Sequence, residues 1–208
     1  MRNTKKGLFI TFEGSEGSGK STQMELIGRY LKEKNKDILF VREPGGVAIS
    51  EKIRAILLDP ENKIMASSCE MLLYMAARAQ LVEEIIAPAL KKGKVVICDR
   101  FLDSTIVYQG YGHQMDIPFI NKVGTFATQG IKPDLTFIFD IEAKKGLARI
   151  KRDKDRIEQR AMTYHTRVRN GYLAIAKKEP KRIKIINSDQ SIEDIHKHVR
   201  QHIDRLLG

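Results

Sequence analysis

Short runs of apolar residues alternate along the chain with longer stretches in which apolar residues recur every three or four positions. The short runs are mostly unbroken, which is typical of strands buried on both faces of a sheet. They predict five strands, at residues 7–13, 37–42, 94–99, 134–140 and 182–187. The longer stretches predict helices near residues 20–34, 48–58, 67–91, 103–112, 117–128, 143–152, 158–178 and 191–206. This alternation predicts an α/β fold in which a parallel sheet is covered by helices on both faces.

Two of the predicted helices carry further signals. Pro88 lies late in the stretch 67–91 and is expected to break that helix into two pieces, because proline lacks a backbone N–H. In the last helix, His198 and His202 have a spacing that suits a metal ion. They lie off the apolar stripe and have no glutamate partner or third ligand nearby, so a structural or solvated role is expected.

The length of 208 residues is enough to bury one large core, and neither a repeat nor a linker marks a second domain. A single domain over residues 1–208 is therefore expected. No apolar run approaches the length of a membrane span, and the N-terminal residues lack the pattern of a signal peptide, so we expect a cytoplasmic location. Cys69 and Cys98 are too few for a disulfide framework or a metal site. Cys98 ends an apolar strand and is expected in the core.

The formal net charge is +11, which favours a polyanionic partner: nucleic acid, an anionic membrane or a small polyanionic substrate. Basic residues are concentrated in residues 142–160 and 177–184. Aromatic residues are not interleaved among them, as they are on surfaces that stack nucleic-acid bases. We therefore expect no nucleic-acid partner, and the second cluster is expected to be a solvated helix end and loop. No membrane partner is expected either.

Residues 14–21 read Gly-Ser-Glu-Gly-Ser-Gly-Lys-Ser, a complete match to the phosphate-binding pattern G-x-x-x-x-G-K-[ST]. A predicted strand precedes the loop and a predicted helix follows it, as the pattern requires. The glycines let backbone N–H groups surround a phosphate chain, Lys20 reaches the outer phosphates and the Ser21 hydroxyl ligates Mg²⁺. The residues expected to bind a nucleoside triphosphate are Gly14, Ser15, Glu16, Gly17, Ser18, Gly19, Lys20, Ser21 and Thr22.

The loop alone does not distinguish a GTPase, an ATPase motor and a small-molecule kinase. A GTPase is disfavoured because the Asn121-Lys-Val-Gly stretch lacks the carboxylate that reads a guanine base. Asp99, at the end of strand 94–99, is the expected acid that holds Mg²⁺ through water. Asp140, at the end of strand 134–140, is the alternative, although it is better placed to begin a turn.

Four further segments resemble motifs of the thymidylate kinase family, in that family's order and spacing. They are Arg42-Glu-Pro-Gly-Gly46, Leu72-Leu-Tyr-Met-Ala-Ala-Arg78, Asp99-Arg100-Phe101-x-x-Ser104 and Asp155-Arg-Ile-Glu158. The resemblance covers essentially the whole chain. It implies the P-loop nucleoside-monophosphate-kinase fold, with a five-stranded parallel sheet and a small mobile lid at about residues 149–160. It also implies that ATP phosphorylates dTMP in the presence of Mg²⁺, in dTTP biosynthesis, and that the protein is a homodimer.

Four arginines suit this reaction, because two anionic nucleotides must be brought together. A guanidinium can grip phosphate oxygens in a two-pronged hydrogen bond. The resemblance implies that Arg42 and Arg100 hold the monophosphate, while Arg54 and Arg78 lie near the acceptor, Arg78 against its base.

The acceptor base and sugar have their own candidates. Tyr74 lies one helical turn before Arg78, where the family usually has a phenylalanine stacked on thymine. A core aromatic is the alternative for this position. By the same resemblance, Thr105 and Gln109 hydrogen-bond the base, and Tyr108 lies against the deoxyribose edge.

The remaining catalytic candidates are in the loop and the lid. The resemblance places the Glu16 carboxylate near the acceptor's 3′-hydroxyl, and a solvated loop acid is the alternative. The loop has no basic residue before Lys20, a bacterial pattern in which the extra catalytic cation comes from the lid. Arg156 is the first candidate for that cation and Arg152 the second. A solvated, salt-bridged turn is the alternative for this segment.

Two rival functions remain at this stage. One is a kinase for another nucleotide or small acceptor, since the fold and donor site would be the same. The other is a nucleotide-dependent switch that binds nucleic acid, which the charge of +11 suggests. The second predicts salt-sensitive polynucleotide binding and no turnover of mononucleotides. The motifs at Arg42 and Asp99 argue against it.

Overall fold

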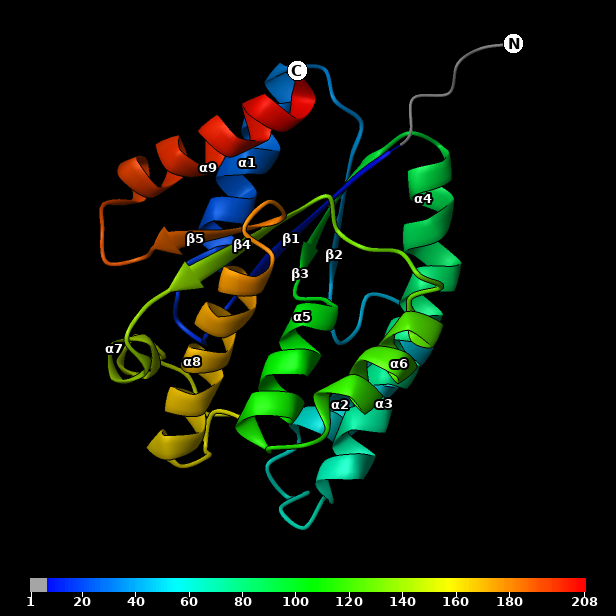
Figure 1. Cartoon of the computed structure of the whole chain (residues 1–208), viewed down its shortest axis with the longest axis vertical. Coiled ribbons are helices and arrows are strands. Elements are labelled where there is room, and N and C mark those ends of the chain that lie inside the picture. Colours follow the sequence, from blue (N-terminus) through cyan, green and yellow to red (C-terminus); the bar gives the residue numbers. More distant parts are fainter. Residues whose placement is uncertain (1–6) are drawn as a thin grey trace.

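A computed structural model describes residues 7–208 of the chain. Its centre is a five-stranded parallel sheet with the strand order β2-β3-β1-β4-β5 (Figure 1). The strands are β1 (Leu8–Gly14), β2 (Ile38–Arg42), β3 (Val95–Asp99), β4 (Leu135–Asp140) and β5 (Ile183–Asn187). The prediction of five parallel strands is therefore confirmed, and each lies within about a residue of its predicted start and end.

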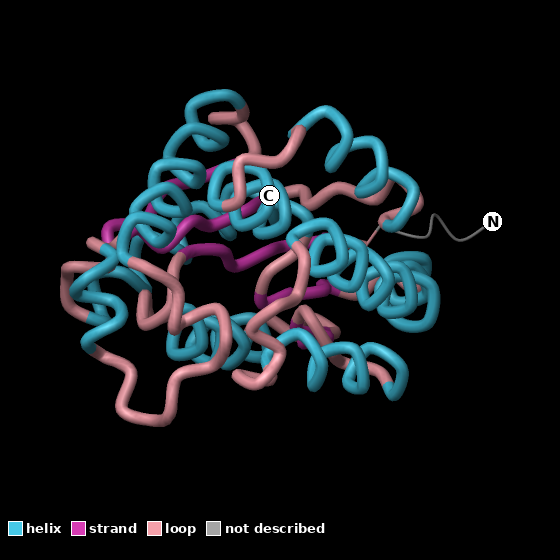
Figure 2. The backbone as a smooth tube through the Cα atoms, turned by 90° about the horizontal axis from the view of Figure 1, so that it is seen from below, coloured by secondary structure: helices cyan, strands magenta, loops and turns pink. Residues whose placement is uncertain are grey.

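Helices cover both faces of the sheet, which forms a layer between them in Figure 2. They are α1 (Lys20–Glu33), α2 (Ala48–Leu58), α3 (Ser67–Leu81), η1 (Val82–Ile86), α4 (Ala87–Lys91), α5 (Leu102–Thr105), η2 (Ile106–Gly112), α6 (Ile117–Ala127), α7 (Ala143–Ala148), α8 (Met162–Lys178) and α9 (Ile192–Leu207). No helix within residues 7–208 is both long and apolar enough to cross a membrane.

Alternate side chains of the central strands enter two separate cores. Phe12, Ile97 and Phe137 face α1 and α9, whereas Phe9 and Cys98 face the helical run from α3 to α4. Cys98 is fully buried, as the sequence predicts. Burial on both faces holds for β1, β3 and β4 but not for the two edge strands, which keep half-exposed apolar positions.

The prediction that Pro88 breaks the helix at residues 67–91 is wrong. The backbone stays helical throughout, and residues 82–86 widen into a π turn in which the Ala87 N–H donates to the Val82 carbonyl. A proline clashes with the carbonyl four residues earlier in a regular helix, and the wider turn displaces that carbonyl.

Two predicted helices are shorter than expected because residues 149–161 are not helical. The helix predicted at 143–152 ends at Ala148, and the one predicted at 158–178 begins at Met162. Within the gap, the Asp155 carboxylate accepts hydrogen bonds from the backbone N–H groups of Ile157 and Glu158, each at 2.9 Å. Such a side-chain turn competes with helix formation.

The connections leave a crevice at the carboxyl ends of β1 and β3. These two strands are hydrogen-bonded neighbours. The helix after β1 packs on one face of the sheet, whereas the Leu102 side chain after β3 packs with the core of the other face. In parallel sheets, ligands bind where the connections diverge in this way. The phosphate-binding loop and Asp99 both lie at this edge.

Candidate active site

The loop between β1 and α1 has the backbone geometry of an anion site. Gly14, Gly17 and Gly19 have φ angles of 134°, 69° and 87°, which residues with a side chain rarely adopt. The first turn of α1 contains no acidic residue, so the partial positive charge of its N-terminus is not neutralised there. The sequence-based prediction of a strand, a glycine-rich loop and a helix is thus confirmed.

Lys20 lies across this loop and is buried. Its Nζ atom donates to the Gly14 and Ser15 carbonyls, at 3.1 Å each. Burial and the neighbouring charge of Arg100 lower the pKa of Lys20 to about 8. The ammonium group is therefore held at the loop, where a phosphate chain would be surrounded.

The loop packs backbone to backbone against α7. A Cβ atom on Gly17 would lie 2.1 Å from the Gly146 carbonyl oxygen, and one on Gly146 would lie 2.4 Å from the Glu16 carbonyl oxygen. Only glycine fits at either position. Arg149, at the end of α7, donates to the Gly17 carbonyl at 3.3 Å. The position of the loop is therefore tied to the helix that leads into residues 149–160.

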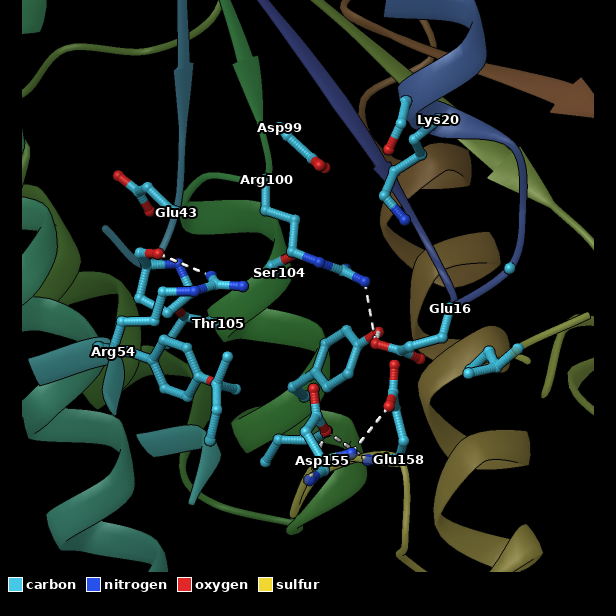
Figure 3. Close-up of a pocket in the computed structure, with 18 of the residues that line it drawn as sticks. Glu16, Lys20, Glu43, Arg54, Asp99, Arg100, Ser104, Thr105, Asp155 and Glu158 are labelled. Carbon is cyan, nitrogen blue, oxygen red and sulfur yellow. Dashed lines mark hydrogen bonds and ion pairs between the residues drawn. The ribbon is translucent and has the colours of Figure 1, made fainter. Parts of the chain in front are cut away.

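The residues expected to hold Mg²⁺ lie on the same cleft as the loop. Asp99 and Ser21 both line it, and Asp99 and Lys20 point toward the same space in Figure 3. The Oδ1 atom of Asp99 is buried without a hydrogen-bond partner among residues 7–208, as an acceptor awaiting an outer ligand would be. Asp140, by contrast, accepts a two-pronged pair from Arg169 at 2.7 and 2.9 Å. The Asp99 carboxylate and the Ser21 hydroxyl are oxygen ligands, and these fit Mg²⁺.

Within residues 7–208, no group of three or more histidine, cysteine, aspartate or glutamate side chains is arranged to hold a metal ion directly. The histidines of α9 are therefore not brought together with further ligands.

Arg100 is the central cation of the cleft. It follows β3 with a left-handed backbone, at a φ angle of 69°, which is unusual for a residue with a side chain. Its guanidinium pairs with Glu16 at 2.9 Å (Figure 3) and lies 5.1 Å from the ring centre of Tyr108. The Tyr108 hydroxyl donates to the same carboxylate at 2.7 Å. Burial opposes ionisation of Glu16, but the charges of Arg100 and Lys20 outweigh it and lower the pKa of Glu16.

A buried network beneath Arg100 was not predicted from the sequence. Glu13 accepts hydrogen bonds from the Phe101 N–H at 2.7 Å and the Tyr172 hydroxyl at 3.0 Å. Ser104 also donates to Glu13, and it accepts from Arg100 at 3.2 Å. Burial and the charge of Asp103 raise the pKa of Glu13 to about 7. The one signal in the sequence is an acidic residue at the end of an otherwise apolar strand.

One cleft of about 440 Å³ joins the loop to the predicted acceptor residues. Its size is within the range of small-molecule sites. The predicted residues that line it are Glu16, Gly17, Lys20, Ser21, Arg54, Tyr74, Arg78, Asp99, Arg100, Thr105, Tyr108, Gln109 and Arg152. In the rest of the loop, Gly14, Ser15 and Ser18 are buried behind it, while Gly19 and Thr22 are exposed.

Several acceptor-side residues are held by internal contacts. Arg54 donates to the Pro44 carbonyl at 2.8 Å, which fixes it at the cleft wall. Arg78 is 1% exposed and pairs with Glu43 at 2.7 Å, while still lining the cleft. Gln109 is also buried and donates to Glu70 at 2.9 Å. These contacts restrain the side chains before any ligand binds, so part of the ordering at that end is already in place.

Arg42 is not where the sequence places it. It does not line the cleft; its guanidinium pairs with Glu51 at 2.8 Å and donates to the Pro44 carbonyl at 3.2 Å. The physical reason is local, because Glu51 in the first turn of α2 also accepts from the Gly46 N–H. The carboxylate closes the Arg42-Glu-Pro-Gly-Gly46 turn and draws Arg42 outward. In this structure Arg42 therefore lies outside the cleft, and its role in holding the monophosphate stays a prediction.

Arg156 also differs from expectation. It is 6% exposed, does not line the cleft, and pairs with the buried Glu70 at 2.6 Å. Its Nε atom donates to the Leu57 carbonyl at 2.8 Å. In this structure Arg156 therefore anchors residues 149–160 to the body of the protein and does not face the cleft, and its role as the cation over the phosphates stays a prediction.

Other basic residues of this segment do reach the cleft. Arg149, Lys151 and Arg152 line it. Arg152 is 64% exposed and is oriented by Glu158, which accepts from both of its terminal nitrogens at 2.9 and 2.7 Å. Arg152, the second candidate from the sequence, is thus the better placed of the two.

The cleft connects a loop for a triphosphate to a pocket rimmed by arginines, with a basic segment between them. This combination is characteristic of P-loop kinases that phosphorylate small phosphorylated acceptors.

Comparisons with known proteins identify the family. The family model described as thymidylate kinase matches residues 12–199. A thymidylate kinase of Exiguobacterium sp. is 48% identical over 204 residues, covering 96% of each chain. One of Symbiobacterium thermophilum is 44% identical, covering 96% of this chain and 94% of its own. A crystal structure of thymidylate kinase from Ehrlichia chaffeensis superposes with a TM-score of 0.77 at 36% identity, covering 95% of this chain and 98% of its own. The chain belongs to the thymidylate kinase family.

The raised pKa of Glu13 predicts a pH dependence of stability. The folded protein holds this proton up to about pH 7, whereas a free carboxyl loses it near 4.5. The folded state therefore binds more protons than the unfolded chain between these values, and the contribution of Glu13 to the free energy of unfolding falls as the pH rises through them. Glu13→Gln removes this titration. Urea unfolding at about pH 5 and about pH 7.5 should show a smaller loss of stability in the variant than in the wild type; equal losses would contradict the assignment.

Arg152 and Arg156 have different surroundings, so replacing each by alanine is expected to have a different effect. Arg152→Ala should lower kcat on the order of tenfold to a hundredfold and leave the melting temperature unchanged, because it removes an exposed cation beside the cleft. Arg156→Ala should mainly lower the melting temperature, because it leaves part of a buried carboxylate uncompensated. Steady-state rates and thermal unfolding of both variants decide. The assignment is wrong if Arg152→Ala keeps its full rate while folded Arg156→Ala loses it.

Proposed function

We propose that the cleft binds ATP at residues 14–22 and dTMP between Tyr74 and Arg100, and transfers the γ-phosphoryl group to give ADP and dTDP for dTTP biosynthesis. The observation that carries this proposal is one continuous cleft lined by Lys20 at one end and by Tyr74 and Thr105 at the other. The family of the chain supplies the identity of the acceptor.

The chemistry needs no general base. An oxygen of the acceptor phosphate, already anionic, attacks the γ-phosphorus, and the bond from that phosphorus to the oxygen bridging to the β-phosphate breaks. The obstacle is repulsion between the two phosphate groups, so cations supply the catalysis. Lys20 at the donor and Arg100 at the acceptor lie on opposite sides of the transferring group, and Arg152 covers it from the lid. Glu16 orients Arg100 and lies near the sugar 3′-hydroxyl.

Mg²⁺ has a natural place in this arrangement. Ser21 and Asp99 would hold it, Asp99 through water, and both line the cleft. A bound Mg²⁺ supplies neutralising charge on the β- and γ-phosphates. Asp99 lies at the end of β3, and its buried Oδ1 atom has no hydrogen-bond partner among residues 7–208, so it can accept from a water on the metal.

The whole chain acts, in this proposal, as a single P-loop kinase domain in which residues 149–160 form a lid. The segment lies between α7 and α8 and lines the cleft with Arg149, Lys151 and Arg152. A cytoplasmic location, with no nucleic-acid or membrane partner, remains a prediction from the sequence.

We also propose a homodimer through α3 and α6. These helices pack together through Met71, Met75 and Ile120. Their other faces keep Leu72, Phe119 and Phe126 exposed by 52%, 51% and 85%. Phe119 and Phe126 are seven residues apart and therefore share one face of α6. Large apolar side chains on an exposed helix face are typical of an interface between subunits.

The dimer proposal predicts that Phe126→Asp shifts the sedimentation coefficient from that of a dimer toward that of a monomer, because it places a charge in an apolar interface. Ile192→Asp is the matched control, since Ile192 is 51% exposed on α9, which packs with α1 on the other face of the sheet. A wild-type protein that sediments as a monomer would refute the proposal.

The shape of the acceptor end predicts an order of substrates. The pocket bounded by Tyr74, Thr105 and Gln109 suits one pyrimidine ring, so purine monophosphates should be rejected. Loss of the thymine methyl should cost about 1–3 kcal/mol, which leaves dUMP a poor but detectable substrate. Tyr108 at the sugar edge should penalise a 2′-hydroxyl and make UMP worse than dUMP.

Values of kcat/KM for dTMP, dUMP, UMP, CMP and AMP at fixed ATP and Mg²⁺ test this order. Faster turnover of AMP or CMP than of dTMP would leave a P-loop kinase but exclude dTMP as its acceptor. Polynucleotide binding without turnover of any mononucleotide would favour the rival nucleotide-dependent switch.

A further inference from the structure

Glu70 is a fully buried carboxylate at the start of α3 that accepts hydrogen bonds from three side chains and forms an ion pair with a fourth, Arg156. Arg156 Nη1 lies at 2.6 Å and Arg160 Nη2 at 2.8 Å. Gln109 Nε2 lies at 2.9 Å and His113 Nε2 at 3.1 Å. Glu70 itself is 0% exposed and does not line the cleft. It therefore touches neither nucleotide.

The charge on Glu70 is permanent near neutral pH. Burial alone would raise its pKa, but the hydrogen bonds from His113 and Gln109 and the charges of Arg156 and Arg160 lower the pKa to about 2. A buried carboxylate is tolerated when it is paired and hydrogen-bonded in this way. Any movement that withdraws one of these donors leaves the remaining charge less well compensated, so the cluster resists rearrangement.

The donors come from the two parts of the site that must act together. Gln109 belongs to η2 and lines the acceptor end of the cleft. Arg156 and Arg160 belong to the lid segment and contact Oε2 of Glu70, whereas Gln109 contacts Oε1. Tyr74, which lines the acceptor end, lies one turn further along α3. One carboxylate thus lies between the pocket for the acceptor base and the base of the lid.

A short chain of contacts connects this anchor to the lid cation. The backbone N–H of Arg156 also donates to the Leu58 carbonyl at 3.2 Å, so the segment is held at a second point. Next to it, Glu158 accepts from the Asp155 N–H at 2.9 Å and from both terminal nitrogens of Arg152. The position of Arg152 over the cleft therefore depends on residues 155–158, which Glu70 fixes through Arg156.

We propose that Glu70 is a positioning residue that couples occupation of the acceptor end to the placement of the lid cations. An acceptor base that contacts Gln109 stiffens the Gln109–Glu70 contact, and the same carboxylate holds Arg156 and Arg160. The inference rests on the proposed function in one respect, namely that dTMP occupies the pocket beside Gln109.

Three variants test the coupling. Glu70→Gln keeps the shape of the side chain and removes its charge. Arg160→Ala removes one lid donor that is 25% exposed, so this variant should fold even if Glu70→Gln does not. Asp140→Asn is the control, because it breaks a two-pronged pair with Arg169 between β4 and α8 that involves neither Glu70 nor the residues lining the cleft.

The first readout is hydrogen–deuterium exchange of residues 149–160, measured with ADP and with or without saturating dTMP. In the wild type and in Asp140→Asn, dTMP should slow exchange in this segment. In Glu70→Gln and in Arg160→Ala, the slowing should be largely lost although calorimetry shows that dTMP still binds. A role limited to stability would lower the melting temperature and leave the effect of dTMP on the lid intact.

The second readout is steady-state kinetics. The kcat of Glu70→Gln should fall roughly tenfold, because the lid cation is misplaced in the reacting complex, while the KM for ATP stays within about twofold. The proposal is overturned if dTMP slows lid exchange in Arg160→Ala as in the control and its kcat is unchanged. If the wild type does not bind dTMP at all, the proposed function fails and this coupling fails with it; binding without any slowing of lid exchange refutes the coupling alone.

Discussion

Repulsion between two phosphate groups in one cleft is the constraint on which the site depends. Cations must be held close together, and each buried guanidinium needs an acid of its own to remain there. The structure meets this with three pairs: Arg100 with Glu16, Arg78 with Glu43, and Arg156 with Glu70. In the proposed reaction the first pair places its cation at the transferring group. The other two pairs hold the walls of the acceptor end and the base of the proposed lid in place. Substrate binding therefore does not have to order the cations that face the substrates.

The parallel sheet makes this concentration of charge possible. Strand β3 pairs with both β1 and β2, and Asp99 lies opposite Phe12 on one side and Arg42 on the other. Residues at or just after the ends of three strands, far apart in sequence, therefore meet at one edge: Glu13 and Glu16, Glu43, and Arg100. The same edge receives the positive end of α1, which adds to the field of the cations. The raised pKa of Glu13 and the lowered pKa of Lys20 both reflect this combination of burial and neighbouring charge.

The sequence predicts what depends on local pattern. Unbroken apolar runs locate all five strands, and the glycine–lysine–serine spacing locates the phosphate-binding loop, because both are set by neighbours in the chain. Contacts between distant residues are not encoded in this way. Nothing near Glu70 indicates that it pairs with Arg156, and nothing near Arg42 indicates that Glu51 draws it outward. The continuous helix at Pro88 has a similar origin, since Leu81, Val82 and Ile86 are buried in one core and hold the π turn in place.

Residues 149–160, the proposed lid, show why residue type alone does not assign a role. Arg152 and Arg156 carry the same guanidinium four residues apart, yet one is 64% exposed at the cleft and the other is buried against Glu70. A cation that is to act on a transient charge must be free to approach it, whereas an anchor must be unable to leave. The two requirements exclude each other in a single side chain. One arginine cannot meet both requirements, so the segment needs at least two. Burial, which only the folded chain determines, decides which arginine is the anchor and which is the cation at the cleft.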